Sequence, residues 1–259
     1  MRICSSIYAD DCAAWKAGRN LKQLNNSIQI YLDQVIKWTE TWGFKLNTDK
    51  SVAVLFTNSK KFQNSINLTI QGKTLKVEKE AKFLGVTYDR QLTWKTHITN
   101  IVEKTKRAFQ LMRNVAGHNW GASKRALLTI YRALVRSRLD YGAEAFYTAS
   151  RSQLKRLDEI QSKCLRVCCR AFKTTANNAL QQDCGEIPSW VRRKRSLLRF
   201  AVKAASNPIN PANTLAIMDW QGNWGKCEPG KEPLNTILKQ YRTNGEEHPI
   251  APTRPSKPP

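Results

Sequence analysis

The spacing of apolar residues changes once along this chain of 259 residues, and this change constrains the fold more than any other feature. From His97 to about Ala205, apolar residues recur every three or four positions, which predicts a series of amphipathic helices. Between Phe44 and Asp89 they form short runs that are typical of β-strands. The sequence therefore predicts an α+β fold rather than a series of βαβ units.

The first 95 residues are expected to form a β-hairpin, a helix and a small antiparallel sheet. An extended segment from Ile3 to Tyr8 is predicted to turn back on itself. A helix is predicted between Asn20, which can cap its start, and Gly43, which can end it. Glycine also indicates a turn at Gln71 to Lys73. The remaining strands are predicted at Val52–Phe56, Ile66–Ile70 and Phe83–Tyr88.

Helices are predicted to dominate residues 96–206. The helical stretches begin near Ile98, after Ser123, at Leu154 and near Ser189, and the last one ends before Pro208, because proline cannot continue a helix. Residues 207–259 are rich in proline, glycine and charge without sustained periodicity, which predicts a flexible, linker-like tail. We therefore expect three parts, residues 1–95, 96–206 and 207–259.

The seven cysteines are an odd number at irregular positions, which does not indicate a disulfide framework. Cys164 and Cys168 lie on an apolar helical stripe that runs from Leu154 to Phe172, and they are predicted to be core residues. The alternative is a zinc site with Cys169 and Cys184, but no CxxC pair or nearby histidine completes a tetrahedral ligand set. Reduced thiols fit an intracellular protein of the nucleus or cytoplasm.

The charge balance predicts a polyanionic partner. The chain has 43 Lys and Arg residues against 20 Asp and Glu residues, a net charge of +23. Nucleic acid is the commonest such partner, and an anionic membrane surface is the rival. The longest apolar run, Val52–Phe56, is too short to span a bilayer, and the N-terminus does not have the order of a signal peptide. We therefore expect nucleic acid, and not a membrane, as the partner.

Two adjacent carboxylates, Asp10 and Asp11, stand out against this basic background. They follow Tyr8 and Ala9 at the tip of the predicted hairpin. Carboxylate oxygens on a rigid support can hold magnesium, and nucleotidyl transfer uses two such ions about 4 Å apart. A tetrapeptide is a weak signal by itself, however, and an ordinary surface turn is the alternative.

Several segments, in the right order, resemble the reverse transcriptases of non-LTR retrotransposons of the jockey-like type. The resemblance covers about residues 3–205. It implies that residues 1–95 form the C-terminal part of a polymerase palm with a primer-grip-like region, and that residues 96–206 form a thumb-like region that binds nucleic acid. The segments that carry it are Ile7-Tyr8-Ala9-Asp10-Asp11, Leu46-Asn47-Thr48-Asp49-Lys50, Phe83-Leu84-Gly85-Val86, Tyr131-Arg132-Ala133-Leu134 and Gln161-Ser162-Lys163-Cys164.

The resemblance implies roles for residues of the hairpin and of a later turn. Asp10 would be the main metal ligand and Asp11 the auxiliary one, and both would be catalytic. Tyr8 and Ala9 would line the path of the primer end. Lys50 would lie near the triphosphate and assist the departure of pyrophosphate as an acid. The alternative for Lys50 is an ordinary solvated turn residue.

The resemblance also implies contacts with the template-primer duplex. Phe83, Leu84 and Gly85 would shape the turn that holds the primer strand, and a buried strand is the competing interpretation of Phe83 and Leu84. For the basic residues of the helices, phosphate binding is favoured over a solvated helix face. These residues are Arg132, Arg136, Lys163, Arg166, Arg192, Arg195, Arg199 and Lys203.

Apolar stripes give further expectations for the helices. The last helix is expected to place its basic residues opposite an apolar face that consists of Val191, Leu198, Ala201, Val202 and Ala205. Three tryptophans lie on such stripes, and we predict that they pack in the core rather than stack on bases. They are Trp38, Trp42 and Trp190.

The expected function is that of a fragment of a transposable-element RNA-directed DNA polymerase, with Mg²⁺, an RNA template, a DNA primer and deoxynucleoside triphosphates. Other parts of the element polyprotein are expected partners. Such polymerases need a third carboxylate upstream, and only seven residues precede Tyr8, so we expect this chain to be inactive by itself. The alternatives are an inactive relic that binds nucleic acid without sequence specificity and a basic membrane-surface or scaffolding protein.

Overall fold

The computed structural model describes residues 3–59, 66–117, 121–208, 210, 212 and 213. The chain divides into two compact units, one formed by Met1–Gly142 with Ala149–Glu186 and the other by Ala143–Thr148 with the segment from Ile187 onward. This division does not follow the boundaries expected after residues 95 and 206. Those boundaries separate parts with different expected functions, and they remain predictions. Most of the predicted tail, residues 207–259, lies outside the described residues.

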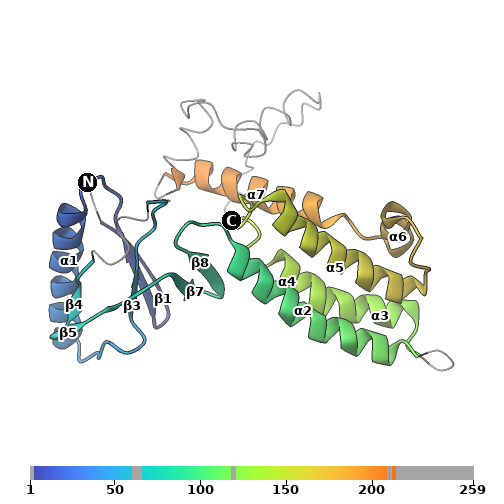
Figure 1. The fold of residues 1–259 in the computed structure, drawn as a ribbon, viewed down its shortest axis with the longest axis horizontal. Helices are drawn as coiled ribbons and strands as arrows, with labels where there is room; N and C mark the ends of the chain where they lie inside the picture. Colours follow the sequence, from blue (N-terminus) through green and yellow to red (C-terminus); the bar gives the residue numbers. More distant parts are fainter. Residues whose placement is uncertain (1–2, 60–65, 118–120, 209, 211, 214–259) are drawn as a thin grey trace, which may run out of the picture. The chain divides into compact units, whose positions relative to one another are not determined.

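A β-hairpin begins the first unit, as the sequence predicts (Figure 1). Strand β1, Cys4–Tyr8, pairs antiparallel with β2, Asp11–Trp15, and Tyr8 lies opposite Asp11. Only two residues therefore connect the strands. The first of them, Ala9, has a φ of 53°, a left-handed conformation that is uncommon for residues other than glycine.

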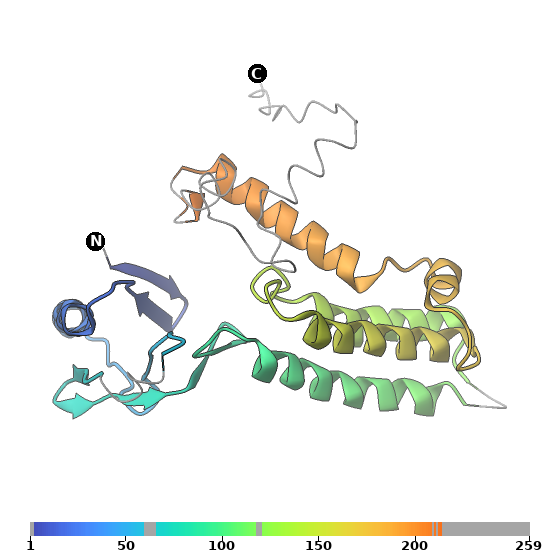
Figure 2. The ribbon, with the colours of Figure 1, turned by 45° about the horizontal axis from the view of Figure 1, so that its top comes forward.

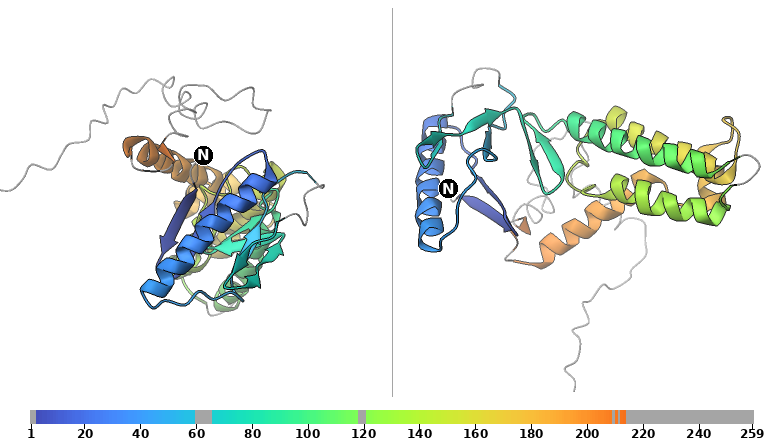
Figure 3. Two further views of the ribbon diagram at one scale, coloured as in Figure 1. Left: turned by 90° about the vertical axis from the view of Figure 1, so that its left-hand side faces the viewer. Right: turned by 90° about the horizontal axis from the view of Figure 1, so that it is seen from below.

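Helix α1, Leu21–Thr41, packs on a small apolar cluster. Asn20 caps its start, because its side-chain oxygen accepts a hydrogen bond from the Gln23 N–H at 3.2 Å. Ile28, Leu32 and Ile36, spaced four residues apart, pack on the cluster. Figures 1 and 3 show the helix beside the short strands of this part of the chain. The cluster consists of Ala53, Leu68, Ile70 and Leu75.

Short strands carry this cluster and continue beyond it. The pair β4, Thr69–Ile70, and β5, Lys73–Thr74, is antiparallel, with the predicted turn at Gln71 and Gly72 between them. Strand β3, Val52–Val54, pairs with β6, Lys76–Glu78, in parallel, so the expectation of purely antiparallel pairing is wrong here. Local apolar runs do not encode the direction in which two strands pair. That direction depends on the connection between them, and β3 is connected to β6 through a segment that contains the β4–β5 hairpin.

The next hairpin corrects a second expectation. Strands β7, Glu80–Phe83, and β8, Val86–Asp89, pair antiparallel, so the run predicted as one strand is interrupted at Leu84 and Gly85. Both turn residues have positive φ, 46° and 79°, the pattern of a two-residue type I′ turn. Leu84 and Gly85 therefore form a turn and Phe83 ends the strand, whereas the predicted role of this turn toward a primer stays a prediction.

Helices complete the first unit, and α2 and α5 lie side by side (Figure 2). Tyr131, which is fully buried, begins a π-helical segment that interrupts the single helix predicted after Ser123. Helix α6 was not predicted, since its eight residues are too few to show a clear period. The elements are α2 Lys95–Val115, α3 Lys124–Ile130, η2 Tyr131–Arg136, α4 Ser137–Asp140, α5 Arg151–Cys169 and α6 Asn177–Cys184.

The core prediction for the cysteines of α5 is confirmed. Cys164 and Cys168 are buried, and burial raises the pKa of both thiols to about 12, so they remain neutral. Phe172, predicted to continue the stripe, is 82% exposed instead. The reason is that α5 ends at Cys169 and Arg170 takes a left-handed conformation with a φ of 51°.

In the second unit, helix α7 spans Ser189–Ser206. Its buried residues are Ser189, Arg193, Leu197, Ala201 and Ala204. The expected apolar face is confirmed only at Ala201, which is 3% exposed. Val202 is 51% exposed, and Val191, Leu198 and Ala205 are only partly buried.

The core prediction is also wrong for the three tryptophans. Trp38, Trp42 and Trp190 are 52%, 66% and 58% exposed. On α1 the buried position falls to Thr39, one residue beyond Trp38 and about 100° further around the helix. Among the described residues, no helix is long and apolar enough to cross a membrane.

Candidate nucleic-acid interface and metal hairpin

The hairpin β1–β2 presents its acidic pair to solvent. Asp10 belongs to the two-residue turn and Asp11 begins β2, and both are exposed, as are Tyr8 and Ala9. Carboxylates in this position are oxygen donors of the kind that Mg²⁺ prefers. In the part of the chain that the structure describes, no three His, Cys, Asp or Glu side chains come together in an arrangement that could hold a metal ion. Asp10 and Asp11 thus fit a part of a metal's ligand set.

Lys50 lies in a tight turn organised by Asn47. The Asn47 side-chain oxygen accepts hydrogen bonds from the N–H groups of Asp49 and Lys50, both at 3.1 Å. The Lys50 side chain is exposed. Within the described residues, no hydrogen bond or ion pair joins it to Asp10 or Asp11.

The β7–β8 turn is held by a residue far along the chain. The Tyr141 hydroxyl donates a hydrogen bond to the Leu84 carbonyl oxygen at 2.7 Å. The Tyr141 ring also covers Gly85, because a Cβ at this glycine would lie 3.2 Å from Cε1 of the ring. A larger residue at position 85 would therefore meet both a positive φ and the tyrosine ring.

Asp89 connects this hairpin to α2. Its carboxylate accepts hydrogen bonds from the N–H of Thr93 at 2.9 Å, the N–H of Trp94 at 2.7 Å and the Thr93 hydroxyl at 2.9 Å. Burial alone would raise the pKa of Asp89, but these hydrogen bonds together lower it below its ordinary value. The carboxylate thereby holds the turn at Thr93 and Trp94, directly before α2 begins at Lys95.

Two of the predicted phosphate-binding arginines also hold a buried carboxylate. Arg132 Nε donates to Glu186 Oε1 at 2.6 Å, and Arg136 Nη1 lies 3.3 Å from Glu186 Oε2. The Glu186 side chain is fully buried, whereas the arginine side chains are 49% and 40% exposed. Each arginine side chain therefore contacts the buried carboxylate and also reaches solvent. Its exposed part is compatible with phosphate contact, and its ion pair with Glu186 gives it a structural role as well.

The remaining predicted basic residues divide into two groups. Arg166 donates to the Thr175 carbonyl oxygen at 3.1 Å and to Asn177 Oδ1 at 2.8 Å, so it stabilises the connection between α5 and α6. Arg192 is only partly exposed and donates to the Ile187 carbonyl oxygen. The exposed group, available for solvent-borne ligands, consists of Lys163, Arg195, Arg199 and Lys203.

Comparison with known proteins finds relatives that align with much of this chain. The chain is 30% identical over 170 residues to the RNA-directed DNA polymerase from mobile element jockey of Drosophila melanogaster. It is 29% identical over 184 residues to the probable RNA-directed DNA polymerase from transposon X-element of the same species. The chain is a homologue of non-LTR retrotransposon RNA-directed DNA polymerases.

The alignments cover much of this chain and little of those two polymerases. They include 63% and 69% of this chain, but only 18% and 19% of the jockey and X-element proteins. The retrovirus-related Pol polyprotein from type-1 retrotransposable element R1 of Nasonia vitripennis is 21% identical over 255 residues, covering 86% of this chain and 73% of that protein. No family model and no solved structure matches the chain.

Three residues of this region form contacts that the sequence did not predict. The sequence indicated no role for Tyr141, Asp89 or Glu186. Aspartate side chains often accept hydrogen bonds from backbone N–H groups a few residues further on, which was a signal for the turn at Asp89. No sequence signal identified Glu186 as the partner of arginines 54 and 50 residues away.

Proposed function

We propose that this chain supplies the metal-binding hairpin and the nucleic-acid grip of a transposable-element RNA-directed DNA polymerase, which extends a DNA primer along an RNA template. The homology to the jockey polymerase carries the proposal, and the exposed acidic pair at the tip of a two-residue hairpin supports it. Residues 1–95 would form the C-terminal part of the palm, residues 96–206 the thumb-like region and residues 207–259 a linker-like tail.

Asp10 and Asp11 would hold Mg²⁺ together with a further carboxylate. When bound, the metal would supply charge stabilisation for nucleotidyl transfer. The chain's own contribution is to present two carboxylates on a turn whose register is fixed by the Tyr8 and Asp11 pairing. Tyr8 and Ala9 would lie beside the primer end, and Lys50 would face the triphosphate of the incoming deoxynucleotide.

The helical part would bind the template-primer duplex through phosphate contacts. Arg195, Arg199 and Lys203 are exposed and lie four residues apart on α7, so they follow one face of the helix. Lys163 on α5 is also exposed. Phosphate contacts of this kind predict strong salt dependence and little sequence preference.

The test is the affinity of the full chain for a labelled RNA–DNA template-primer, measured by fluorescence anisotropy between about 50 and 200 mM salt. Replacing Arg195, Arg199 and Lys203 by alanine should weaken binding about tenfold or more and reduce the salt slope by about one for each phosphate that the variant no longer binds. The control replaces three exposed lysines of the first unit, Lys22, Lys76 and Lys79, by alanine.

Affinity that does not change with salt, or equal reductions in both variants, would contradict the proposed grip. Tighter binding to phosphatidylserine vesicles than to the duplex would favour a membrane-surface protein instead. Primer extension under the same conditions tests catalysis separately, and we expect none from the chain by itself.

A further inference from the structure

Two thiols are in contact where α6 ends against α5 in the first unit. Cys169 is the last residue of α5 and Cys184 is the last residue of α6, and the two helices pack on each other. Their Sγ atoms lie 3.0 Å apart. A disulfide bond is about 2.0 Å long, so a movement of about 1 Å would bring the sulfur atoms to bonding distance. The pair is therefore in position to form a covalent bond between the two helices.

The backbone beside the two thiols permits this movement. Each cysteine is followed directly by a residue with a positive φ, Arg170 at 51° and Gly185 at 60°, and each of these residues ends its helix. Because no further helical turn follows either cysteine, a small shift at these positions leaves the preceding hydrogen bonds of both helices in place.

The other cysteines of the described residues are less well placed for such a bond. Cys164 and Cys168 are 0% and 2% exposed, whereas Cys169 is only partly buried. Cys4 and Cys12 are exposed, but the register of the β1–β2 hairpin does not pair them with each other. An oxidant in solution therefore reaches Cys169 more easily than the core thiols and finds a second thiol directly behind it.

At neutral pH both thiols of the pair are protonated. Burial, with the contact to Cys184 as the second cause, raises the pKa of Cys169. Burial also raises the pKa of Cys184, although the charge of the nearby Lys124 ammonium group favours the thiolate there. Because the thiolate and not the thiol is the nucleophile, the pair reacts slowly and needs an added oxidant.

We propose that Cys169 and Cys184 are a site of reversible oxidation, at which a small-molecule disulfide of the glutathione class converts the two thiols into a disulfide bond that holds α6 against α5. The Cys169 thiolate attacks one sulfur of the small molecule, which forms a mixed disulfide and releases one thiol. Cys184 then attacks the Cys169 sulfur and releases the second thiol. Two electrons pass from the cysteines to the small molecule, and the two cysteine protons end on the two released thiols.

The bond would fix the end of α6 beside two ion pairs. Lys124 Nζ lies 2.7 Å from Oδ1 of Asp183, directly before Cys184. Glu186, two residues after Cys184, holds two arginines with its buried carboxylate. The linked cysteines are 15 residues apart, and closing such a loop lowers the entropy of the open state. Helix α6 should therefore separate from α5 less often in the oxidised chain.

The first test maps the disulfide bonds of the full chain after incubation with oxidised glutathione and alkylation of the remaining thiols. Mass spectrometry of peptides before and after reduction should find Cys169 linked to Cys184 as the predominant bond within the chain. Cys169→Ser should abolish this link, whereas the exposed double variant Cys4→Ser with Cys12→Ser should retain it. A chain unfolded in guanidinium should form several different links instead.

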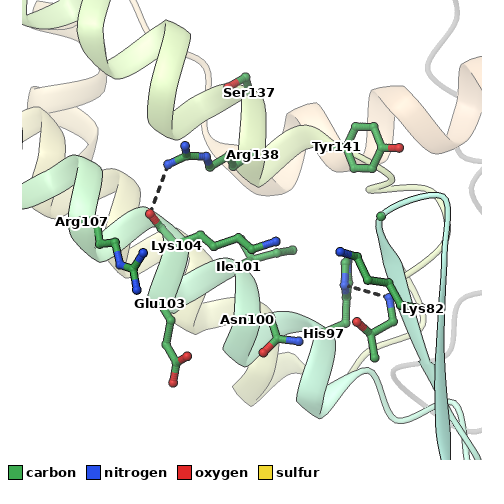
Figure 4. A pocket seen from close by; sticks show the side chains of 12 residues that line it. Lys82, His97, Asn100, Ile101, Glu103, Lys104, Arg107, Ser137, Arg138 and Tyr141 are labelled. Carbon is green, nitrogen blue, oxygen red and sulfur yellow. Dashed lines mark hydrogen bonds between the residues drawn. The ribbon is translucent and has the colours of Figure 1, made fainter. Parts of the chain in front are cut away.

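Hydrogen exchange then measures the effect of the bond. In the oxidised wild-type chain, amides of α6 should exchange about tenfold more slowly than in the reduced chain, and Cys169→Ser treated in the same way should show no change. The internal control is a hollow of about 590 Å³ formed by the β7–β8 hairpin, α2 and α4 (Figure 4). None of the described cysteines lines it, so the amides around it should exchange equally in both redox states.

The proposal is overturned if oxidised glutathione leaves both thiols free in the folded chain or gives only mixed disulfides with glutathione. Equally frequent links between other cysteines, or a Cys169 to Cys184 bond that does not slow exchange in α6, would overturn it as well. Thermal melting verifies that each variant folds. The bond map and the exchange rates of the wild-type chain decide the question even where a variant does not fold.

Discussion

Single side chains hold together elements of the candidate nucleic-acid interface, and Asp89 does so between β8 and α2. Its three hydrogen bonds link the end of β8 to Thr93 and Trp94, where the chain enters α2. Trp94 has a φ of 64°, a strained conformation for a tryptophan, and the carboxylate accepts its N–H. The ionised form of Asp89 therefore contributes to the stability of the folded state.

We expect Asp89→Asn to lower the free energy of unfolding by about 1 kcal/mol at pH 7, because it weakens hydrogen bonds from the turn residues Thr93 and Trp94 to a charged carboxylate. Because the folded-state pKa of Asp89 is lowered, its contribution is present above the unfolded value of 3.8 and is lost as pH falls through the folded value. Urea unfolding at pH 7 and pH 3 should show the difference from wild type shrinking in acid. An unchanged difference at pH 3 would contradict this account, and Asp49→Asn, at an exposed position, is the control.

Glu186 is the second such residue, since its fully buried carboxylate pairs with Arg132 and Arg136. Glu186→Gln should destabilise the protein by about 2 kcal/mol. This is less than the effect of breaking a fully buried ion pair, because both arginines keep contact with solvent. Chemical denaturation with exposed Glu159→Gln as the comparison measures this. If the two variants were equally stable, the pair would have no anchoring role.

At the scale of elements, the β7–β8 hairpin depends on Tyr141. Tyr141→Phe removes only the hydroxyl that donates to Leu84, so we expect the hairpin to open more often while the helices stay intact. Hydrogen exchange should become about fivefold faster at the amides of β7 and β8, as expected when a hydrogen bond worth about 1 kcal/mol is removed. The β4–β5 hairpin, which has its own Gln71 and Gly72 turn, provides the internal control. Equal acceleration in both hairpins would indicate general destabilisation instead.

Elements whose formation depends on local spacing were predictable, and those that depend on partners were not. The start of α1 at Asn20 follows from a cap and an apolar period that lie within a few residues. The parallel pairing of β3 with β6 and the exposure of Trp38 depend on what lies across from them in space. The same holds for the candidate sites: the acidic hairpin was visible in the sequence, whereas the contact of Cys169 with Cys184 needed the fold to bring the ends of α5 and α6 together.

At the scale of the whole molecule, a net charge of +23 provides general attraction for nucleic acid. Asp10 and Asp11, in contrast, need a further carboxylate to complete a metal site. The alignment with the jockey polymerase covers 18% of that protein, which leaves room for a third carboxylate elsewhere in it. Among the described residues, no third carboxylate joins Asp10 and Asp11 in a metal site. Because a missing metal ligand costs orders of magnitude in rate, we expect the chain by itself to show no primer extension.

A chimera that joins the preceding part of the jockey polymerase to this chain should extend a DNA primer on an RNA template. Activity should require Mg²⁺, disappear with EDTA and fall by at least about 100-fold in Asp10→Asn, whereas exposed Asp49→Asn should retain it. Asp10 and Asp49 are both exposed, so Asp10→Asn and Asp49→Asn should leave the melting temperature unchanged. Duplex binding without extension in a folded chimera would show that the hairpin no longer completes a catalytic site, and the chain would then be a nucleic-acid-binding relic of the polymerase.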